Sequence, residues 1–233
     1  MNPADRPGPI RTGAARWRNA GPVILVTVLL AAAACGSSST PTTAGPETTE
    51  AAAATEVTAY AGYQREPIPS VAELGLPAVE ADGSETPFLF RAQPDSLLLV
   101  YFGYTSCPDV CPTTLSDVRL AGEQLGADAD RVDLAMVTID PEVDSPEVLV
   151  GYVRTFVPDA VALRTTDDAR LRPVADRFGA DYGKEVVDGE AEVFHTASIY
   201  AVDDQGRLLM TWPFGIPPTD LATDLQRLLA DEA

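Results

Sequence analysis

The sequence predicts an α/β sandwich with a mixed central β-sheet flanked by helices. Two strongly apolar segments, Leu97–Phe102 and Val132–Ile139, have the character of strands covered on both faces. Each is followed by a segment in which apolar residues recur at helical spacing, and a strand–turn–strand pattern precedes a final helix near the C-terminus. Strand–helix–strand units followed by a hairpin and a helix are typical of this fold class.

The first half of the folded part contains two short strands, the two core strands and one long helix. Asp82-Gly83-Ser84 predicts a turn between the short strands. Apolar spacing predicts a helix over Pro112–Leu125, and Gly126 is a suitable residue to end it. This helix therefore connects Leu97–Phe102 with Val132–Ile139.

The second half opens with a helix that has clear start signals. Ser145 is a suitable N-cap and Pro146 a suitable first residue, so a helix is expected through about Phe156. The remaining elements are a shorter helix, a strand–turn–strand hairpin and a terminal amphipathic helix: Asp167–Phe178 with Gly179 after it, Thr196–Val202, Asp203–Gly206, Arg207–Trp212 and Thr219–Leu229.

The first 34 residues have the composition of a secretory signal peptide. Four arginines precede the uncharged stretch Gly21–Ala34. This stretch has 14 residues, which is shorter than the roughly 20 that a membrane-spanning helix needs. Its length therefore favours a cleaved signal peptide, and a retained membrane anchor is the alternative interpretation. The stretch ends in Ala33-Ala34-Cys35, which resembles a bacterial lipoprotein lipobox, although Ala32 stands where such boxes prefer Leu. Cys35 is then the expected site of lipidation.

Residues 35–65 predict a flexible tether that follows the lipidated Cys35. They are rich in Ser, Thr, Pro and Ala and cannot bury enough apolar surface to offset the entropy of ordering. The folded domain is therefore expected over residues 66–233. A lipid on Cys35 would hold this exported protein on the extracytoplasmic face of the cell membrane.

Charge and composition exclude several classes of protein. The 233 residues include 16 Lys and Arg against 35 Asp and Glu, and the net charge of −19 argues against a nucleic-acid partner. Three Cys are too few for a disulfide-stapled scaffold, and the single His excludes a His-rich zinc site.

Cys107 and Cys111 lie at the start of the helix predicted after the first core strand. Their i, i+4 spacing brings both sulfurs to one side of a helical turn, where they can form a disulfide or bind one soft metal ion. A helix N-terminus also lowers the pKa of a nearby thiol. A plain structural disulfide is the alternative. Only His195 could add an imidazole ligand, and a lone His more often has no such role.

The segment Tyr101-Phe-Gly-Tyr-Thr-Ser-Cys107-Pro-Asp-Val-Cys111-Pro strongly resembles the core motif of the Sco/SenC family. Further matches are Val137-Thr-Ile-Asp140-Pro-Glu, Asp144-Ser-Pro146 and Phe194-His195-Thr, and the resemblance covers roughly residues 75–229. It implies a thioredoxin-like fold and a copper site made by Cys107, Cys111 and His195. It also implies that the two Cys cycle between dithiol and disulfide. The implied role is to deliver copper to the dinuclear copper centre of cytochrome c oxidase, or to prepare the thiols of that centre.

Three further features have weaker interpretations. Asp140 ends a core strand and is a candidate for orienting a ligand, with a cap of the Pro141 turn as the alternative. The acidic stretch Asp181–Val193 is expected to be a solvated loop. A set of aromatic residues is a candidate shield for the site, with ordinary core packing as the alternative: Phe102, Tyr104, Tyr200, Trp212 and Phe214.

Three functions follow from these features. The first is an extracytoplasmic copper metallochaperone, which is not a turnover enzyme and serves the copper-bearing subunit of cytochrome c oxidase or another copper protein. The second is a thiol–disulfide oxidoreductase, which needs the two Cys but not His195 and works with a thiol reductant or a thioredoxin-like protein. The third is a tethered binding domain with an inert disulfide.

Overall fold

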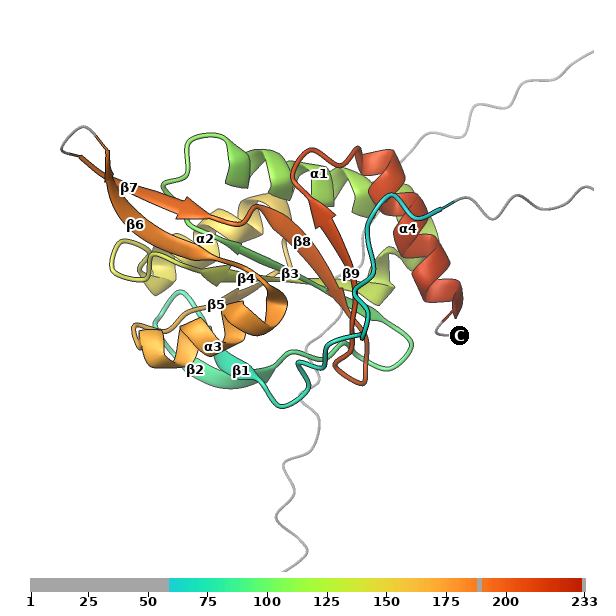
Figure 1. Cartoon of the computed structure of the whole chain (residues 1–233), viewed down its shortest axis with the longest axis horizontal. Coiled ribbons are helices and arrows are strands. Elements are labelled where there is room, and N and C mark those ends of the chain that lie inside the picture. Colours follow the sequence, from blue (N-terminus) through green and yellow to red (C-terminus); the bar gives the residue numbers. More distant parts are fainter. Residues whose placement is uncertain (1–58, 188–189, 232–233) are drawn as a thin grey trace, which may run out of the picture. The chain divides into compact units, whose positions relative to one another are not determined.

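A mixed seven-stranded sheet lies at the centre of the part of the chain that the structure describes. This computed structural model describes residues 59–187 and 190–231 (Figure 1). The strand order is β2-β1-β5-β4-β3-β8-β9. The strands are β1 (Gly75–Val79), β2 (Glu85–Leu89), β3 (Leu97–Gly103), β4 (Val132–Thr138), β5 (Val161–Leu163), β8 (Ser198–Val202) and β9 (Leu208–Pro213).

The strand β3 is the centre of this sheet, and all seven of its residues are buried. It pairs in parallel with β4, from Leu97 opposite Val132 to Gly103 opposite Thr138, and antiparallel with β8. The carboxyl ends of β3 and β4 therefore lie at the same edge of the sheet. Loops that leave two neighbouring parallel strands at one edge are a common place for functional residues in α/β proteins.

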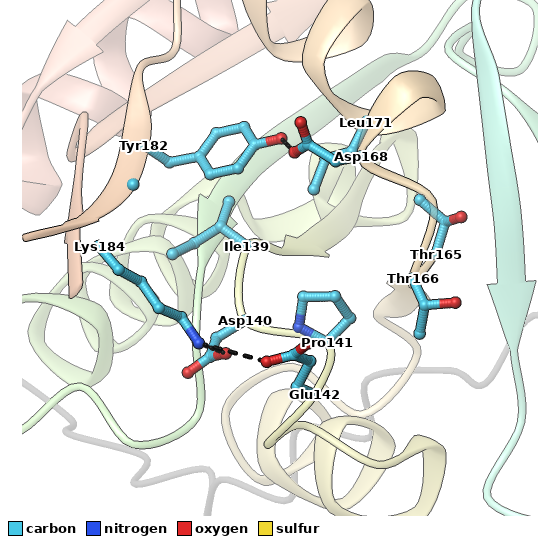
Figure 2. A pocket seen from close by; sticks show the side chains of 11 residues that line it. Ile139, Asp140, Pro141, Glu142, Thr165, Thr166, Asp168, Leu171, Tyr182 and Lys184 are labelled. Carbon is cyan, nitrogen blue, oxygen red and sulfur yellow. Dashed lines mark hydrogen bonds and ion pairs between the residues drawn. The ribbon is translucent and has the colours of Figure 1, made fainter. Parts of the chain in front are cut away.

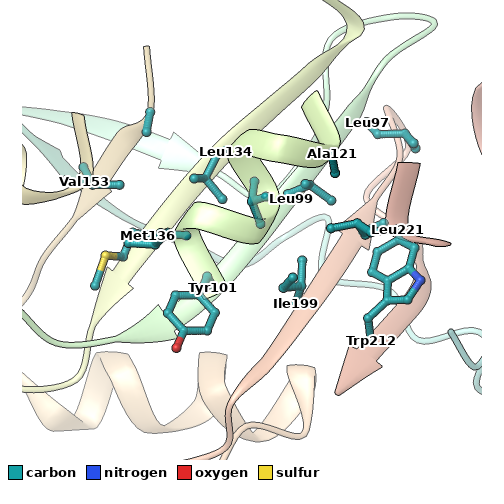
Figure 3. Packing of buried hydrophobic residues seen from close by; sticks show 14 of the residues in the cluster. Leu97, Leu99, Tyr101, Ala121, Leu134, Met136, Val153, Ile199, Trp212 and Leu221 are labelled. Carbon is teal, nitrogen blue, oxygen red and sulfur yellow. The ribbon is translucent and has the colours of Figure 1, made fainter. Parts of the chain in front are cut away.

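Four helices cover the two faces of the sheet in the described residues. They are α1 (Val110–Leu125), α2 (Pro146–Phe156), α3 (Asp168–Phe178) and α4 (Pro218–Asp231). The helices α1, α2 and α4 pack on one face, where side chains such as Leu99 and Met136 form the core shown in Figure 3. The helix α3 packs on the other face against Val100 and Phe102. This division follows from the alternation of side chains along β3.

The elements expected from the sequence are present, with boundaries that differ by a few residues. The helix α1 begins at Val110, two residues before the predicted start, and Gly126 ends it as expected. The Ser145 side chain accepts a hydrogen bond from the Val148 N–H at 3.3 Å, which confirms it as the N-cap of α2. The Asp167 side chain caps α3 in the same way, and Gly179 follows in the left-handed region.

The expectation of a loop over Asp181–Val193 is wrong for the described residues, because most of them form a separate two-stranded hairpin made by β6 (Tyr182–Val187) and β7 (Glu190–His195). The expected solvent exposure is present at Asp181, Glu185 and Glu192. The alternation of apolar and charged residues in β7 is the pattern of a strand. The three-residue strand β5 is also absent from the sequence-based prediction, because such a short apolar segment has no measurable periodicity.

The packed region begins before residue 66, where the sequence analysis places the end of the tether. The Gly62 N–H donates to the Asp224 carboxylate at 2.9 Å, and Tyr63 exchanges two backbone hydrogen bonds with Thr211. Arg65 donates to the Phe178 carbonyl at 2.8 Å. These partners lie more than 100 positions away along the chain, so local composition carries no sign of them.

The predicted signal peptide over residues 1–34, the lipidation site Cys35 and most of the tether lie outside the described residues. Among the helices that the structure does describe, none is both long and apolar enough to cross a membrane.

Candidate metal centre

Cys107 and Cys111 lie where the chain turns from the end of β3 into α1. Both are free thiols, with Cys107 9% exposed and Cys111 completely buried. The Cys107 sulfur accepts a hydrogen bond from the Cys111 N–H at 3.3 Å. The Asp109 side chain makes no capping bond, so the Cys107 sulfur takes the place of a side-chain cap at this helix start. The expected disulfide cycle of this pair stays a prediction.

His195 is the last residue of β7, and its ring reaches the cysteines from the hairpin. Its Nε2 atom lies 3.5 Å from the Cys111 sulfur, and its Nδ1 atom lies 3.3 Å from the Thr196 carbonyl oxygen. A carbonyl oxygen can only accept a hydrogen bond, so the short Nδ1 contact favours the tautomer with the proton on Nδ1. The Nε2 lone pair then faces the two sulfurs, as a metal ligand requires.

The three expected ligand residues therefore come together. The two sulfurs and one imidazole nitrogen all lie within 4.8 Å of one another. Atoms bound to one ion at about 2.0–2.3 Å are at most about 4.6 Å apart, so small side-chain shifts suffice to bind an ion. Two thiolates and an imidazole suit soft Cu(I). Structural zinc normally takes four protein ligands, and this group in the described region has three.

The two thiols differ in acidity. Burial raises the pKa of Cys107, but hydrogen bonds from the Cys111 and Asp109 N–H groups and from the Cys111 and Tyr104 side chains outweigh burial, so the net pKa is lowered. Burial raises the pKa of Cys111 to about 12, and the lowering influence of the nearby Tyr101 hydroxyl offsets only part of this effect. Cys107 is therefore the sulfur that ionises first in the absence of metal.

The His195 imidazole is kept neutral by its surroundings. Burial lowers its pKa below the usual value of 6.5, and the hydrogen bond to Thr196 only partly opposes this effect. A metal ligand must be deprotonated at the coordinating nitrogen. Burial thus favours the form of His195 that can bind a metal.

Two tyrosine rings flank His195 edge-on, but only one belongs to the expected aromatic shield. The Tyr104 ring lies 5.7 Å from the imidazole and the Tyr101 ring 6.0 Å, both nearly perpendicular to it. Tyr101 is not recognisable as a site residue from its strand pattern, because its place inside a core strand resembles ordinary packing. The motif that begins at Tyr101 is the only signal that could have found it.

The other four residues of that aromatic set have different surroundings. Phe102 and Tyr200 pack with Phe178 on the α3 face of the sheet, as the core alternative expects. The buried Trp212 donates its indole N–H to the Asp224 carboxylate at 2.9 Å. Phe214 is 46% exposed.

Gly103 allows the close packing of this site. A side-chain Cβ at this position would lie 2.7 Å from a ring carbon of Tyr101 and 3.0 Å from the Cys111 sulfur. The end of β3 therefore needs glycine, because any larger residue would push the sulfur or the ring aside.

Asp144 holds the loop that precedes Cys107. Its carboxylate is fully buried and accepts hydrogen bonds from the Thr105 N–H at 3.2 Å and from the hydroxyls of Thr105 and Thr138 at 2.5 Å. It thereby fastens the loop after β3 to the end of β4. The motif that contains Asp144 does not reveal this role, because Thr105 lies 39 positions away in the chain.

Asp140 contacts the hairpin through Lys184. Its buried carboxylate forms an ion pair with the Lys184 ammonium at 2.9 Å. The Asp140 backbone carbonyl accepts the N–H groups of Val143 and Asp144, so the backbone makes the turn at Pro141. Within the described residues, no hydrogen bond joins Asp140 to the cysteines or His195. Its expected role in orienting a ligand stays a prediction.

Comparison with known proteins identifies one family. The SCO1/SenC family model matches residues 91–230. A SCO2-like protein of Rickettsia prowazekii is 34% identical over 116 residues, which cover 48% of this chain and 56% of that protein. The chain thus spans about half the length of the curated relatives it matches.

Two solved structures are similar to this chain in both fold and sequence. Copper-bound ScoI of Bradyrhizobium japonicum has a TM-score of 0.53 and 30% identity, covering 66% of this chain and 96% of that one. Apo Sco1 of Thermus thermophilus has a TM-score of 0.57 and 31% identity, and the match covers 76% of this chain and 97% of that one. These likenesses confirm the expected thioredoxin-like sandwich and support copper as the metal. Since the family match extends over more than half of the sequence, the chain belongs to the SCO1/SenC family.

Proposed function

We propose that this protein carries one copper ion and transfers it to an exported copper protein. The observation that carries the proposal is the meeting of Cys107, Cys111 and His195, whose ligand atoms lie within 4.8 Å of one another at the edge of the sheet. The resemblance to copper-bound ScoI supports copper as the cargo. The copper-bearing subunit of cytochrome c oxidase is the first candidate recipient.

Transfer would proceed by ligand exchange. Both cysteines must be reduced, because a disulfide cannot supply thiolates. Cys107 is slightly exposed whereas Cys111 is fully buried. A thiolate of the recipient would therefore replace Cys107 first, with the more deeply placed ligands following.

Cys35 would hold the domain near a membrane-bound recipient. The proposal places the protein outside the cell membrane, with the signal peptide removed and a lipid on Cys35. The acidic chain would be repelled by anionic lipids, so the anchor and not the surface charge would keep it there.

A Cu(I) titration against a competing chelator tests the proposal. The full chain is used reduced and free of oxygen, with Cys35→Ser in every sample so that this thiol cannot bind copper. We expect one tightly bound Cu(I), lost in Cys107→Ser and Cys111→Ser and weakened in His195→Ala. Removing an outer partner of a metal ligand typically costs about 10- to 100-fold in affinity, so removing a ligand itself should cost at least as much. Equal affinity in His195→Ala would overturn the three-ligand site.

The second candidate function is thiol–disulfide exchange with partner cysteines. The unequal acidity of the two thiols favours it, because Cys107 would attack and Cys111 would resolve the mixed disulfide. The two thiols would lose two electrons and two protons to form a disulfide, and the partner disulfide would gain them. Reduction of a disulfide-linked peptide that survives His195→Ala but not Cys111→Ser would favour this function over copper transfer.

A further inference from the structure

The position of His195 depends on how the β6–β7 hairpin is attached to the domain. The hairpin forms its own two-stranded sheet, with Tyr182 paired opposite His195 and Lys184 opposite Val193. A two-stranded hairpin alone is only marginally stable in water. Side-chain contacts with the rest of the domain must therefore hold the strand that carries the imidazole.

The first attachment is made by α3 at the base of the hairpin. The Tyr182 hydroxyl donates to the Asp168 carboxylate at 2.5 Å, and the Arg172 guanidinium donates to the Tyr182 carbonyl at 3.1 Å. The same guanidinium lies 3.7 Å from the centre of the Tyr182 ring. This attachment acts on the residue directly opposite His195.

The second attachment is made by Lys184 on the loop between β4 and α2. Its ammonium lies 2.9 Å from the Asp140 carboxylate and 3.7 Å from that of Glu142. Figure 2 shows Lys184 reaching from the hairpin to these two acids. All three residues line a pocket of about 260 Å³. Residues two apart in a strand share a face, and cross-strand partners share it too, so Lys184 lies on the face of the hairpin that carries Tyr182 and His195.

The Lys184–Asp140 ion pair has a buried carboxylate, as the Arg207–Asp203 pair also does, and so differs from the exposed ion pairs of the described surface. The Asp140 side chain is 6% exposed, whereas both partners of the Arg119–Glu123 pair on α1 are well exposed, at 38% and 46%. Exposed pairs contribute little, but removing the partner of a buried charge leaves that charge uncompensated. Lys184 is the one cation paired with Asp140 among the described residues, so this contact is suited to hold the hairpin.

We infer that Lys184 is a positioning residue for His195, and that its ion pair with Asp140 holds the hairpin in the orientation that completes the metal site. The inference rests on the proposed copper site and assigns Asp140 an indirect role. Asp140 acts on the imidazole through the hairpin and without touching a ligand. Loss of the ion pair would leave the hairpin held by the contacts of Tyr182 and by the packing of Val193 on the core. The His195 imidazole would then move away from the two sulfurs more often.

The test compares Lys184→Met, which has similar length but no charge, with Lys184→Arg. Arg119→Met is the matched control, because it removes one positive charge from an exposed ion pair on another element. Cu(I) dissociation into excess chelator is measured for each full-length variant, with Cys35→Ser throughout. We expect dissociation about 3- to 10-fold faster in Lys184→Met, less than the 10- to 100-fold cost of losing a direct partner of a ligand. Lys184→Arg and Arg119→Met should stay within about twofold of the parent.

A double-mutant cycle separates positioning of His195 from a general effect of charge. In a His195→Ala background, Lys184→Met should have no further effect on Cu(I) affinity, because the residue it positions is gone. A full effect in that background would overturn the inference. Equal effects of Lys184→Met and Arg119→Met would overturn it too.

Hydrogen exchange in the metal-free protein gives a readout that does not involve copper. We expect the amides of β6 and β7 to exchange at least about threefold faster in Lys184→Met than in Arg119→Met, because local opening is less costly without the ion pair. Unchanged exchange would contradict the inference. A parent protein that binds no Cu(I) would instead refute the proposed function, and exchange would still test whether Lys184 holds the hairpin.

Discussion

The Nε2 atom of His195 lies 3.5 Å from the sulfur of Cys111, although 84 positions separate the two residues in the chain. One residue belongs to the first turn of α1 and the other ends β7. The fold brings them together because β3 leads into α1 at the edge of the sheet beside which the β6–β7 hairpin lies (Figure 1). The metal centre is thus a property of the complete fold and not of the Cys-containing motif alone.

The two thiols should react at different rates with an alkylating reagent. In the reduced protein at pH 7, we expect Cys107 to be modified well before Cys111, because its pKa is lowered while that of Cys111 is raised to about 12. Mass spectrometry of peptides at timed intervals, with Cys35→Ser, measures the order. In the Cys107→Ser variant, the remaining Cys111 thiol should then be alkylated very slowly. Faster modification of Cys111 would contradict the assignment.

The single imidazole of the chain should titrate below the usual His value. Burial lowers the pKa of His195 from 6.5, and because the sequence has one His, NMR of the metal-free protein reports it without overlap. Below pH 6.5 the unfolded chain binds this proton more readily than the folded protein, so stability falls as the pH falls from 6.5 toward the folded pKa. Above 6.5 the imidazole is neutral in both states and this contribution is constant.

A His195→Gln variant isolates that contribution. Relative to this variant, the parent should lose free energy of unfolding between pH 7.5 and pH 5, as measured by urea denaturation at each pH. An NMR midpoint at or above 6.5, or a difference that does not depend on pH, would contradict the expected effect of burial.

Gly103→Ala should damage both stability and metal binding. The new Cβ would lie 3.0 Å from the Cys111 sulfur, and overpacking of this kind typically costs about 1–3 kcal/mol. Gly151→Ala is the matched control, because that glycine lies within α2 with no atom within 4 Å of the added Cβ. It should raise stability by about 0.5–1 kcal/mol, through the better helix propensity of Ala. If the two substitutions change the free energy of unfolding by similar amounts, overpacking at Gly103 is excluded as the explanation.

Asp144→Ala should destabilise the domain strongly. It would leave the Thr105 N–H and the Thr138 hydroxyl without their acceptor in a buried place, at a cost of about 2–4 kcal/mol. Asp82→Ala is a suitable comparison, since it removes an exposed turn contact with the Ser84 N–H and should have a much smaller effect. Urea denaturation of both variants measures the difference. A small change for Asp144→Ala would mean that water replaces the carboxylate.

Much of the fold could be predicted because local signals agree with the final packing. The apolar segment that forms β3 is buried along its whole length, and Ser145 caps α2 as its sequence context suggests. The β6–β7 hairpin is harder to predict, because its many acidic residues suggest a solvated loop. Its residue Tyr182 is buried through contacts with α3, and the local composition does not reveal these contacts. Composition also hides the start of the packed region, since Gly62 and Tyr63 follow a low-complexity stretch.

The metal ligands were predictable, whereas the residues that support them were not. Cys107, Cys111 and His195 lie within motifs that resemble one family. Asp144 and Lys184 have ordinary sequence surroundings, and their roles arise from partners brought close by the sheet. A single sequence contains no direct information on such contacts.

The division of the core between the two faces of the sheet has a consequence for folding. Cys107 and Cys111 pack in the layer of α1, α2 and α4, whereas Tyr182 anchors the hairpin of His195 in the layer of α3. The three ligands can meet only after both layers have docked on the sheet, and contacts of long sequence separation form late. An incompletely folded chain would present a dithiol without its imidazole. High-affinity loading with metal would therefore mark a molecule whose folding has finished.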